Sequence, residues 1–91
     1  MITIYKYEVR IADEFVIEMP KGARILTVQT QGGAPFLWAL VENTASMTMR
    51  TFALRGTGHQ SDGLALAPFV GTFQLHNGAL VFHLFDLGEP K

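Results

Sequence analysis

Apolar and polar residues alternate over short runs along this chain, and turn residues interrupt the pattern at intervals of about ten residues. No window keeps a helical period over a useful length. The pattern therefore predicts an all-β domain, a compact antiparallel sandwich or flattened barrel of six to seven strands spanning residues 1–91, with 88–91 as a short tail. The expected strands are Ile2–Ile11, Phe15–Met19, Arg24–Gln31, Phe36–Glu42 and Met47–Arg55, followed by a hairpin over Phe69–Leu87.

The strongest local signal is Asn77-Gly78 between two alternating runs, which predicts a β-hairpin with a type I′ turn. A two-residue loop places His76 opposite Ala79 and Thr72 opposite His83 and puts both histidines on the mixed face of the hairpin. They are then four residues apart along the sheet, about 13 Å. Two imidazoles that share a metal ion need Cβ atoms within roughly 8 Å, so no metal site is expected and separate exposed or hydrogen-bonded rings are the simpler interpretation.

The run Phe36–Glu42 is apolar at almost every position, which is typical of a central strand covered on both faces. Pairing across Gly32–Pro35, with a loop of either two or four residues, should place Ile25 and Thr27 on the same face as Trp38. One face can pack on a second sheet, whereas the other needs a helix, a returning strand or another subunit. Apolar residues make up 48% of the chain and charged residues 16%, so a buried partner surface is favoured and a homo-oligomer is predicted. The candidate interface residues are Phe36, Trp38, His76 and His83.

Charge and composition narrow the classes of partner. The net charge is −1 and the seven Lys and Arg residues are scattered, which argues against nucleic acid. The longest apolar run, Ala34–Val41, is far shorter than the roughly 20 residues that span a bilayer, so no membrane partner is expected. The first residues lack the pattern of a signal peptide, and the chain has no cysteine, so a cytoplasmic location is expected.

The long irregular segment Gly56–Pro68 carries most of the candidate chemistry. Glycine-rich backbone can form an anion-binding turn, and an arginine can pair with a phosphate. The candidate ligand- or partner-binding residues are Arg55, Thr57, His59, Ser61 and Asp62. Neither the P-loop nor the dinucleotide fingerprint is present, so no cofactor is expected. A solvated loop is the simpler interpretation of the same residues.

Three functions remain open. The first is a non-enzymatic binding module that holds a host protein or a small anionic ligand at the loop. The second is a small hydrolase in which His59 acts with Ser61 or Asp62, although no third group is evidently placed to orient the histidine and no catalytic residue is assigned. The third is a structural virion or assembly component.

The chain resembles a family of small uncharacterised proteins encoded mainly by bacteriophages and prophages and known only as a domain of unknown function. The resemblance rests on Ile4–Tyr7, Glu18–Ala23, Leu37–Val41, Gly56–His59, Gly71–Gln74 and Ala79–His83 and covers nearly the full length. It implies a phage or prophage origin and a free-standing small β-domain. The resemblance assigns neither an activity nor a catalytic residue to this chain.

Overall fold

The computed structural model describes residues 1–90, which form seven strands and no helix. Every strand pairing in this range is antiparallel. The strands are β1 (Ile2–Glu8), β2 (Glu14–Pro20), β3 (Arg24–Gln31), β4 (Ala34–Glu42), β5 (Met47–Gly56), β6 (Phe69–Leu75) and β7 (Leu80–Gly88).

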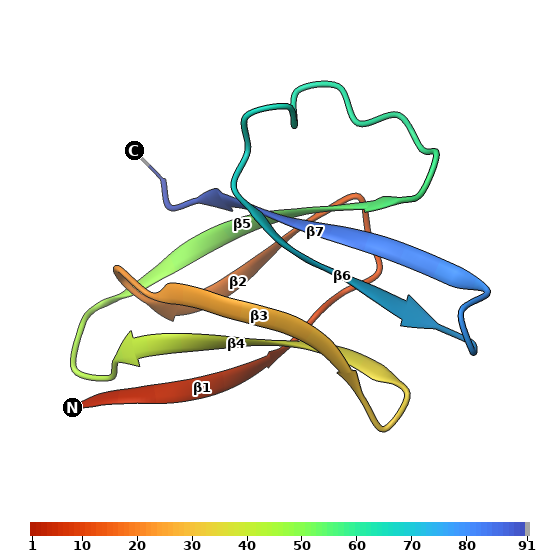
Figure 1. The fold of residues 1–91 in the computed structure, drawn as a ribbon. Helices are drawn as coiled ribbons and strands as arrows, with labels where there is room; N and C mark the ends of the chain where they lie inside the picture. Colours follow the sequence, from red (N-terminus) through yellow and green to blue (C-terminus); the bar gives the residue numbers. More distant parts are fainter. Residues whose placement is uncertain (91) are drawn as a thin grey trace.

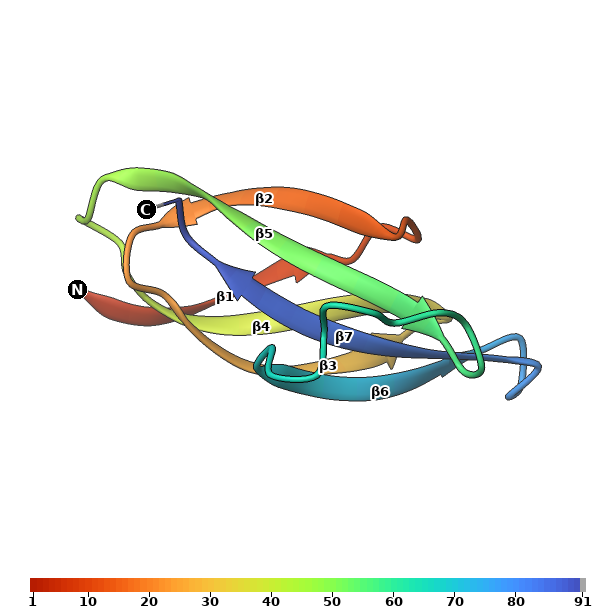
Figure 2. The ribbon, with the colours of Figure 1, turned by 90° about the horizontal axis from the view of Figure 1, so that it is seen from above.

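The strands form two sheets that pack face to face (Figures 1 and 2). One sheet has the order β1-β4-β3 and the other the order β2-β5-β7-β6. The domain measures 40 × 31 × 16 Å, so it is a flattened sandwich. The predicted fold class is therefore confirmed.

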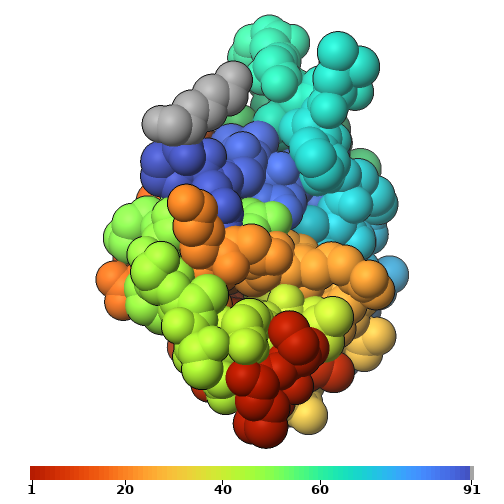
Figure 3. Space-filling model, turned by 90° about the vertical axis from the view of Figure 1, so that its left-hand side faces the viewer, coloured from red at the N-terminus to blue at the C-terminus, as the bar shows by residue number. Residues whose placement is uncertain are grey.

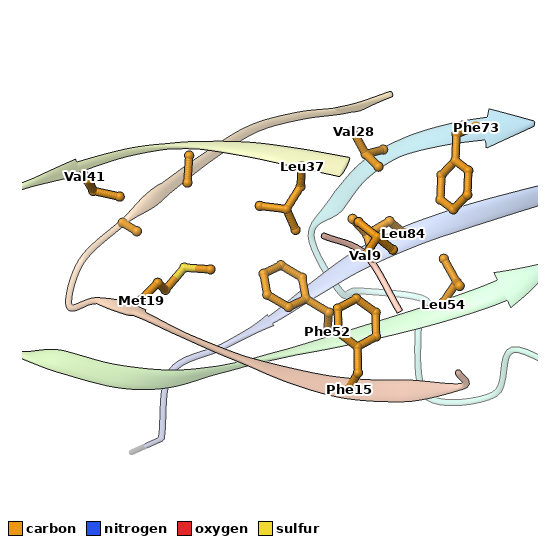
Figure 4. Packing of buried hydrophobic residues seen from close by; sticks show 12 residues of the cluster. Val9, Phe15, Met19, Val28, Leu37, Val41, Phe52, Leu54, Phe73 and Leu84 are labelled. Carbon is orange, nitrogen blue, oxygen red and sulfur yellow. The ribbon is translucent and has the colours of Figure 1, made fainter. Parts of the chain in front are cut away.

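The core lies between the two sheets (Figure 4). Every strand except β1 supplies fully buried residues, and Tyr7 of β1 is partly buried against them. In β4 the side chains alternate strictly, with Leu37, Ala39 and Val41 buried and the residues between them half-buried. Phe52 of β5 stacks on Phe15 of β2, with ring centroids 5.5 Å apart. The period of two in the sequence thus corresponds to one buried face on each sheet.

The two sheets approach each other most closely along β3 and β6. At Gly71 of β6, a Cβ atom would lie 3.0 Å from Cγ1 of Val28 on β3. No ladder joins these two strands. This side of the sandwich is therefore closed by side-chain packing, and the glycine makes room for it.

The register predicted for the final hairpin is confirmed. Gln74 pairs with Val81 and Thr72 with His83. Asn77 and Gly78 both have positive φ, and the Ala79 N–H donates to the His76 carbonyl at 3.1 Å, as a type I′ turn requires. The ladder stops one pair earlier than expected because His76 also has a positive φ of 53°. His76 is therefore part of the turn and does not belong to the mixed face.

The facing predicted for Ile25 is wrong. The turn between β3 and β4 has two residues, one of the two lengths expected, and its register runs unchanged from Gln31 to Thr27, which lies opposite Trp38. It then shifts by one residue at Leu26, so that Ile25 pairs with Ala39 and packs against the core. Because a β-bulge of this kind shifts the register by one residue, the side chains of β3 before Leu26 face the opposite way from the prediction.

The first strand is shorter than the predicted Ile2–Ile11. The Val9 N–H still donates to the Pro35 carbonyl at 3.1 Å. Proline has no N–H with which to return a hydrogen bond, so the ladder ends there. At the other end of the chain, Gly88 is the last residue of β7, and the Glu89 carboxylate accepts a hydrogen bond from the Gly22 N–H at 2.6 Å.

β4 is the central strand of its sheet, as its sequence predicted. Its inner face packs on the other sheet, but its outer face has no further layer among residues 1–90. Phe36 and Trp38 lie on this outer face and are half-buried. The Lys6 side chain of β1 crosses Phe36, with Nζ 4.6 Å from the ring centroid, and ends at Gln31 of β3. Coverage of this face by another subunit stays a prediction.

Candidate functional site

The segment between β5 and β6 runs over the outer side of the four-stranded sheet (Figure 1, green to cyan). It begins with a tight turn in which the His59 N–H donates to the Gly56 carbonyl at 3.0 Å. The His59 ring lies directly over Gly56, because a Cβ atom at Gly56 would be 2.9 Å from Cε1 of the ring. Glycine at this position therefore leaves room for the imidazole.

An open hollow of about 360 Å³ lies beside this turn. It is lined by Asp13, Arg55, His59, Gln60 and Asp62. The structure therefore brings three of the five predicted site residues together, namely Arg55, His59 and Asp62. The hollow combines one guanidinium and two carboxylates with an imidazole and an amide, so it can exchange several polar contacts with a partner.

Hydrogen bonds hold two sides of the hollow in place. Nη1 of Arg55 donates to the Asp13 carbonyl at 2.6 Å and to the Leu54 carbonyl at 3.0 Å. Across the hollow, Nε2 of Gln60 donates to Oδ2 of Asp62 at 2.6 Å. Asp13 reaches the site because β2 pairs with β5, which places it next to Leu54. The guanidinium is thus oriented by backbone carbonyls, and none of residues 1–90 provides it with a carboxylate partner.

The other two predicted residues, Thr57 and Ser61, support the loop and do not line the hollow. The Ser61 hydroxyl donates to the His59 carbonyl at 3.0 Å. Oγ1 of Thr57 lies 2.7 Å from Nε2 of His83, which is a residue of β7. Both hydroxyls therefore make hydrogen bonds that stabilise the loop.

The four predicted interface residues lie on different surfaces. Phe36 and Trp38 are on the outer face of the three-stranded sheet, with ring centroids 6.4 Å apart. His83 is on the outer side of the other sheet, where its ring bridges two threonine hydroxyls, Oγ1 of Thr57 at Nε2 and Oγ1 of Thr72 at Nδ1 (2.8 Å). His76 lines a second hollow near the β3–β4 turn. The four residues therefore lie in three separate surface regions, and a role for them at an interface stays a prediction.

Sequence reasoning missed Asp13 and Gln60. Gln60 lies between two candidate residues in the loop, so its position alone could have suggested it. Asp13 is 42 residues away from Arg55, and only the β2–β5 pairing reveals it. No local signal in the sequence indicates that pairing.

Two features are absent from residues 1–90. No group of three or more His, Cys, Asp or Glu side chains gathers there in an arrangement that could hold a metal ion. The same range contains no helix of the length and apolarity that a membrane span requires.

Fold and site together define a small two-sheet antiparallel β-domain with a polar hollow beside the loop that begins at Gly56. The protein family described as "Domain of unknown function (DUF7352)" matches residues 1–91, so the chain belongs to that family. Comparisons with curated proteins and with solved structures found no match.

Proposed function

We propose that the protein is a non-enzymatic binding module that holds a partner at the hollow beside the Gly56–Gly63 loop. The observation that carries the proposal is the convergence of Arg55, His59 and Asp62 around one open hollow. These side chains come from a strand end and a loop, a combination in which a rigid sheet commonly positions binding residues. The position of the His59 ring over Gly56 adds pre-organisation, which lowers the cost of binding.

The charges favour a protein as the partner. Asp13 and Asp62 both line the hollow, so a small anion at Arg55 would also meet two carboxylates. A protein surface can present donors and acceptors together and so complement both charge signs. The resemblance to phage and prophage proteins supports a host protein in this role. A small anionic ligand at Arg55 is the second possibility.

The geometry gives less support to the hydrolase alternative. A histidine that activates a serine has to lie within hydrogen-bond reach of its hydroxyl. The Ser61 hydroxyl instead donates to the His59 backbone carbonyl. Asp62 accepts from Gln60, and no hydrogen bond within residues 1–90 joins it to the His59 ring. Binding therefore accounts for the arrangement better than catalysis does.

The test begins with native mass spectrometry of the purified protein, which identifies a retained protein or small molecule. Affinity for the identified partner is then measured by calorimetry for Arg55→Ala and His59→Ala. We expect binding about tenfold weaker or worse, because both side chains lie at the centre of the contact. His76→Ala is the matched control, since it removes an exposed histidine at a different hollow, and it should bind like the wild type.

Unchanged affinity in both loop variants, with unfolding curves that show an intact fold, would contradict the proposal. The small-anion possibility has its own measurement, a titration with inorganic phosphate followed by NMR. Shifts confined to the amides around Arg55 and His59 would identify an anion site. A spectrum without changes would exclude phosphate and leave the protein partner.

A further inference from the structure

Four strands lie at sheet edges, namely β1, β2, β3 and β6. An edge strand exposes unpaired N–H and C=O groups, and natural proteins protect it with charges, proline, bulges or covering segments. β3 and β6 lie against each other, and each has an irregularity in its register. β2 carries exposed Glu14 and Glu18 and ends in Pro20. Three of the four edges are therefore protected.

β1 has the weakest protection, since its only charges are Lys6 and, at the strand end, Glu8. It pairs with β4 over seven residues without a bulge and contains neither proline nor glycine. Its lysine, the residue type that usually blocks an edge, is drawn away from it, since Nζ of Lys6 donates to Oε1 of Gln31 on the far strand of the sheet at 2.9 Å. Ile2, Ile4 and Tyr5 are 62%, 54% and 40% exposed. β1 lies at the lower left of the molecule in Figure 1 and at its lower end in Figure 3 (red).

The backbone groups that point toward the open edge can be identified. The Val9 N–H donates to β4 at Pro35, and the Met1 carbonyl accepts from Asn43, so the odd-numbered residues point toward β4. N–H and C=O groups of neighbouring residues in a strand point to opposite sides. The free groups therefore belong to Ile2, Ile4, Lys6 and Glu8, the same residues whose side chains lie on the outer face.

We propose that β1 pairs antiparallel with β1 of a second copy of this chain and joins two three-stranded sheets into one of six strands. The register that pairs all seven residues places Tyr5 beside the two-fold axis. Ile4 then faces the partner subunit's Lys6, and Ile2 faces the partner subunit's Glu8. The free groups meet in hydrogen-bonded pairs, and no charged residue faces a like charge.

Neighbouring registers are less favourable. A shift of the partner by two residues in one direction places Lys6 opposite the partner's Lys6. A shift by two in the other direction leaves Glu8 unpaired. Like charges that face each other directly destabilise a strand pair, and each unpaired residue loses backbone hydrogen bonds. The interface lies on a different strand from the loop hollow, so the proposal stands apart from the proposed function.

A cysteine scan tests the register, and the chain is suited to it because it has no cysteine. Tyr5→Cys should form a disulfide-linked dimer on mild oxidation, since residues in a non-hydrogen-bonded antiparallel pair have Cα atoms about 4.5 Å apart. Thr3→Cys is the matched control. Thr3 faces the partner's Tyr7 and lies four residues away from the partner's Thr3, about 13 Å, so this variant should not cross-link rapidly.

A charge pair tests the same register without covalent chemistry. Ile4→Lys sets two lysines opposite each other at two symmetry-related places, and the dimer dissociation constant should rise by about tenfold. Ile4→Glu faces the partner's Lys6 and should dimerise like the wild type. Ile4 is more than half exposed in one chain, so both variants should fold, and sedimentation velocity measures the mass of each. Adding Lys6→Glu to Ile4→Lys should restore the dimer.

Hydrogen exchange supplies a third readout. In the dimer, the amides of Ile4 and Lys6 become protected as the protein concentration rises, whereas those of Tyr5 and Tyr7 are protected at every concentration. A wild-type protein that stays monomeric from micromolar to millimolar concentration would overturn the proposal. So would a dimer in which Tyr5→Cys does not cross-link and Ile4→Lys has no effect, because another surface would then join the copies.

Discussion

Arg50 of β5 binds Asp86 of β7 through two parallel hydrogen bonds, from Nε to Oδ1 at 2.9 Å and from Nη2 to Oδ2 at 2.7 Å. Both side chains are only 12% exposed. Nη1 donates in addition to the Ala23 carbonyl at 2.8 Å, next to the start of β3. The hydrogen bonds to Asp86 raise the pKa of the guanidinium, so Arg50 stays charged throughout the accessible pH range. One side chain thus connects β5 and β7 with the segment that leads into β3.

Removing one member of this pair should be costly. We expect Arg50→Met to lower the free energy of unfolding by about 3 kcal/mol, because Asp86 is left as an unpaired, mostly buried charge. Urea denaturation followed by circular dichroism measures the change. The double variant with Asp86→Leu removes both charges and should recover most of the loss. A single variant as stable as the wild type would show that the pair contributes nothing.

Gly71→Ala tests the close approach of β6 to β3. The new methyl group would lie 3.0 Å from Cγ1 of Val28, so the Val28 side chain or its strand has to shift slightly. Overpacking of this kind costs about 1–3 kcal/mol, which thermal unfolding can measure. Val28→Ala in the same chain removes the clashing methyl groups and should make Gly71→Ala less costly than it is alone. Equal effects in both backgrounds would contradict this contact.

Thr57→Val and Thr72→Val each remove one hydroxyl from His83. Each loses a side-chain hydrogen bond, and we expect a loss of about 1 kcal/mol in unfolding free energy for both. Only Thr57 lies in the loop segment, so Thr57→Val should also speed hydrogen exchange in residues 57–68, with Thr72→Val as its control. Identical exchange in the two variants would show that His83 does not hold the loop.

His76→Gly should stabilise the protein by about 0.5 kcal/mol. His76 has a φ of 53°, a left-handed conformation that costs a side-chain-bearing residue about 1–2 kcal/mol, and glycine avoids this cost but loses more entropy on folding. Ala79→Gly in the same turn is the control and should destabilise, since Ala79 is not among the positive-φ residues. The midpoint of thermal unfolding measures both. A lower midpoint for His76→Gly would mean that the imidazole makes a stabilising contact.

Glu42 predicts a pH dependence of stability. Hydrogen bonds from the N-terminal ammonium and then from the Thr44 hydroxyl lower the pKa of its carboxyl below the ordinary 4.5. A lowered folded-state pKa adds stability above the unfolded-state value, and that contribution is lost as the pH falls through the folded-state value. Glu42→Gln should therefore be less stable than the wild type at neutral pH and equally stable in strong acid. A difference that does not change with pH would contradict this assignment.

Local signals in the sequence predicted local structure correctly. Asn77-Gly78 and Gly32-Gly33 specify their own turns, because their backbone conformations favour these residues. The bulge at Leu26 has no such signal, since Leu26 is an ordinary strand residue, and the face of Ile25 was predicted wrongly as a result. Of the residues that line the candidate hollow, the sequence predicted Arg55, His59 and Asp62, which lie in or next to the loop. Asp13 joins Arg55 through a strand pairing between distant residues, which depends on the packing of the whole chain.

The place of β7 between β5 and β6 has a consequence for synthesis on the ribosome. β7 is made after both β5 and β6, yet the four-stranded sheet has no ladder between these two strands without it. Leu54 of β5 pairs with Leu84 of β7, and both are almost completely buried. A nascent chain therefore keeps apolar surfaces of β5 and β6 exposed until β7 has emerged. Chains that stop before β7 should aggregate or be degraded, so a truncated product is not expected to accumulate as a functional shorter form.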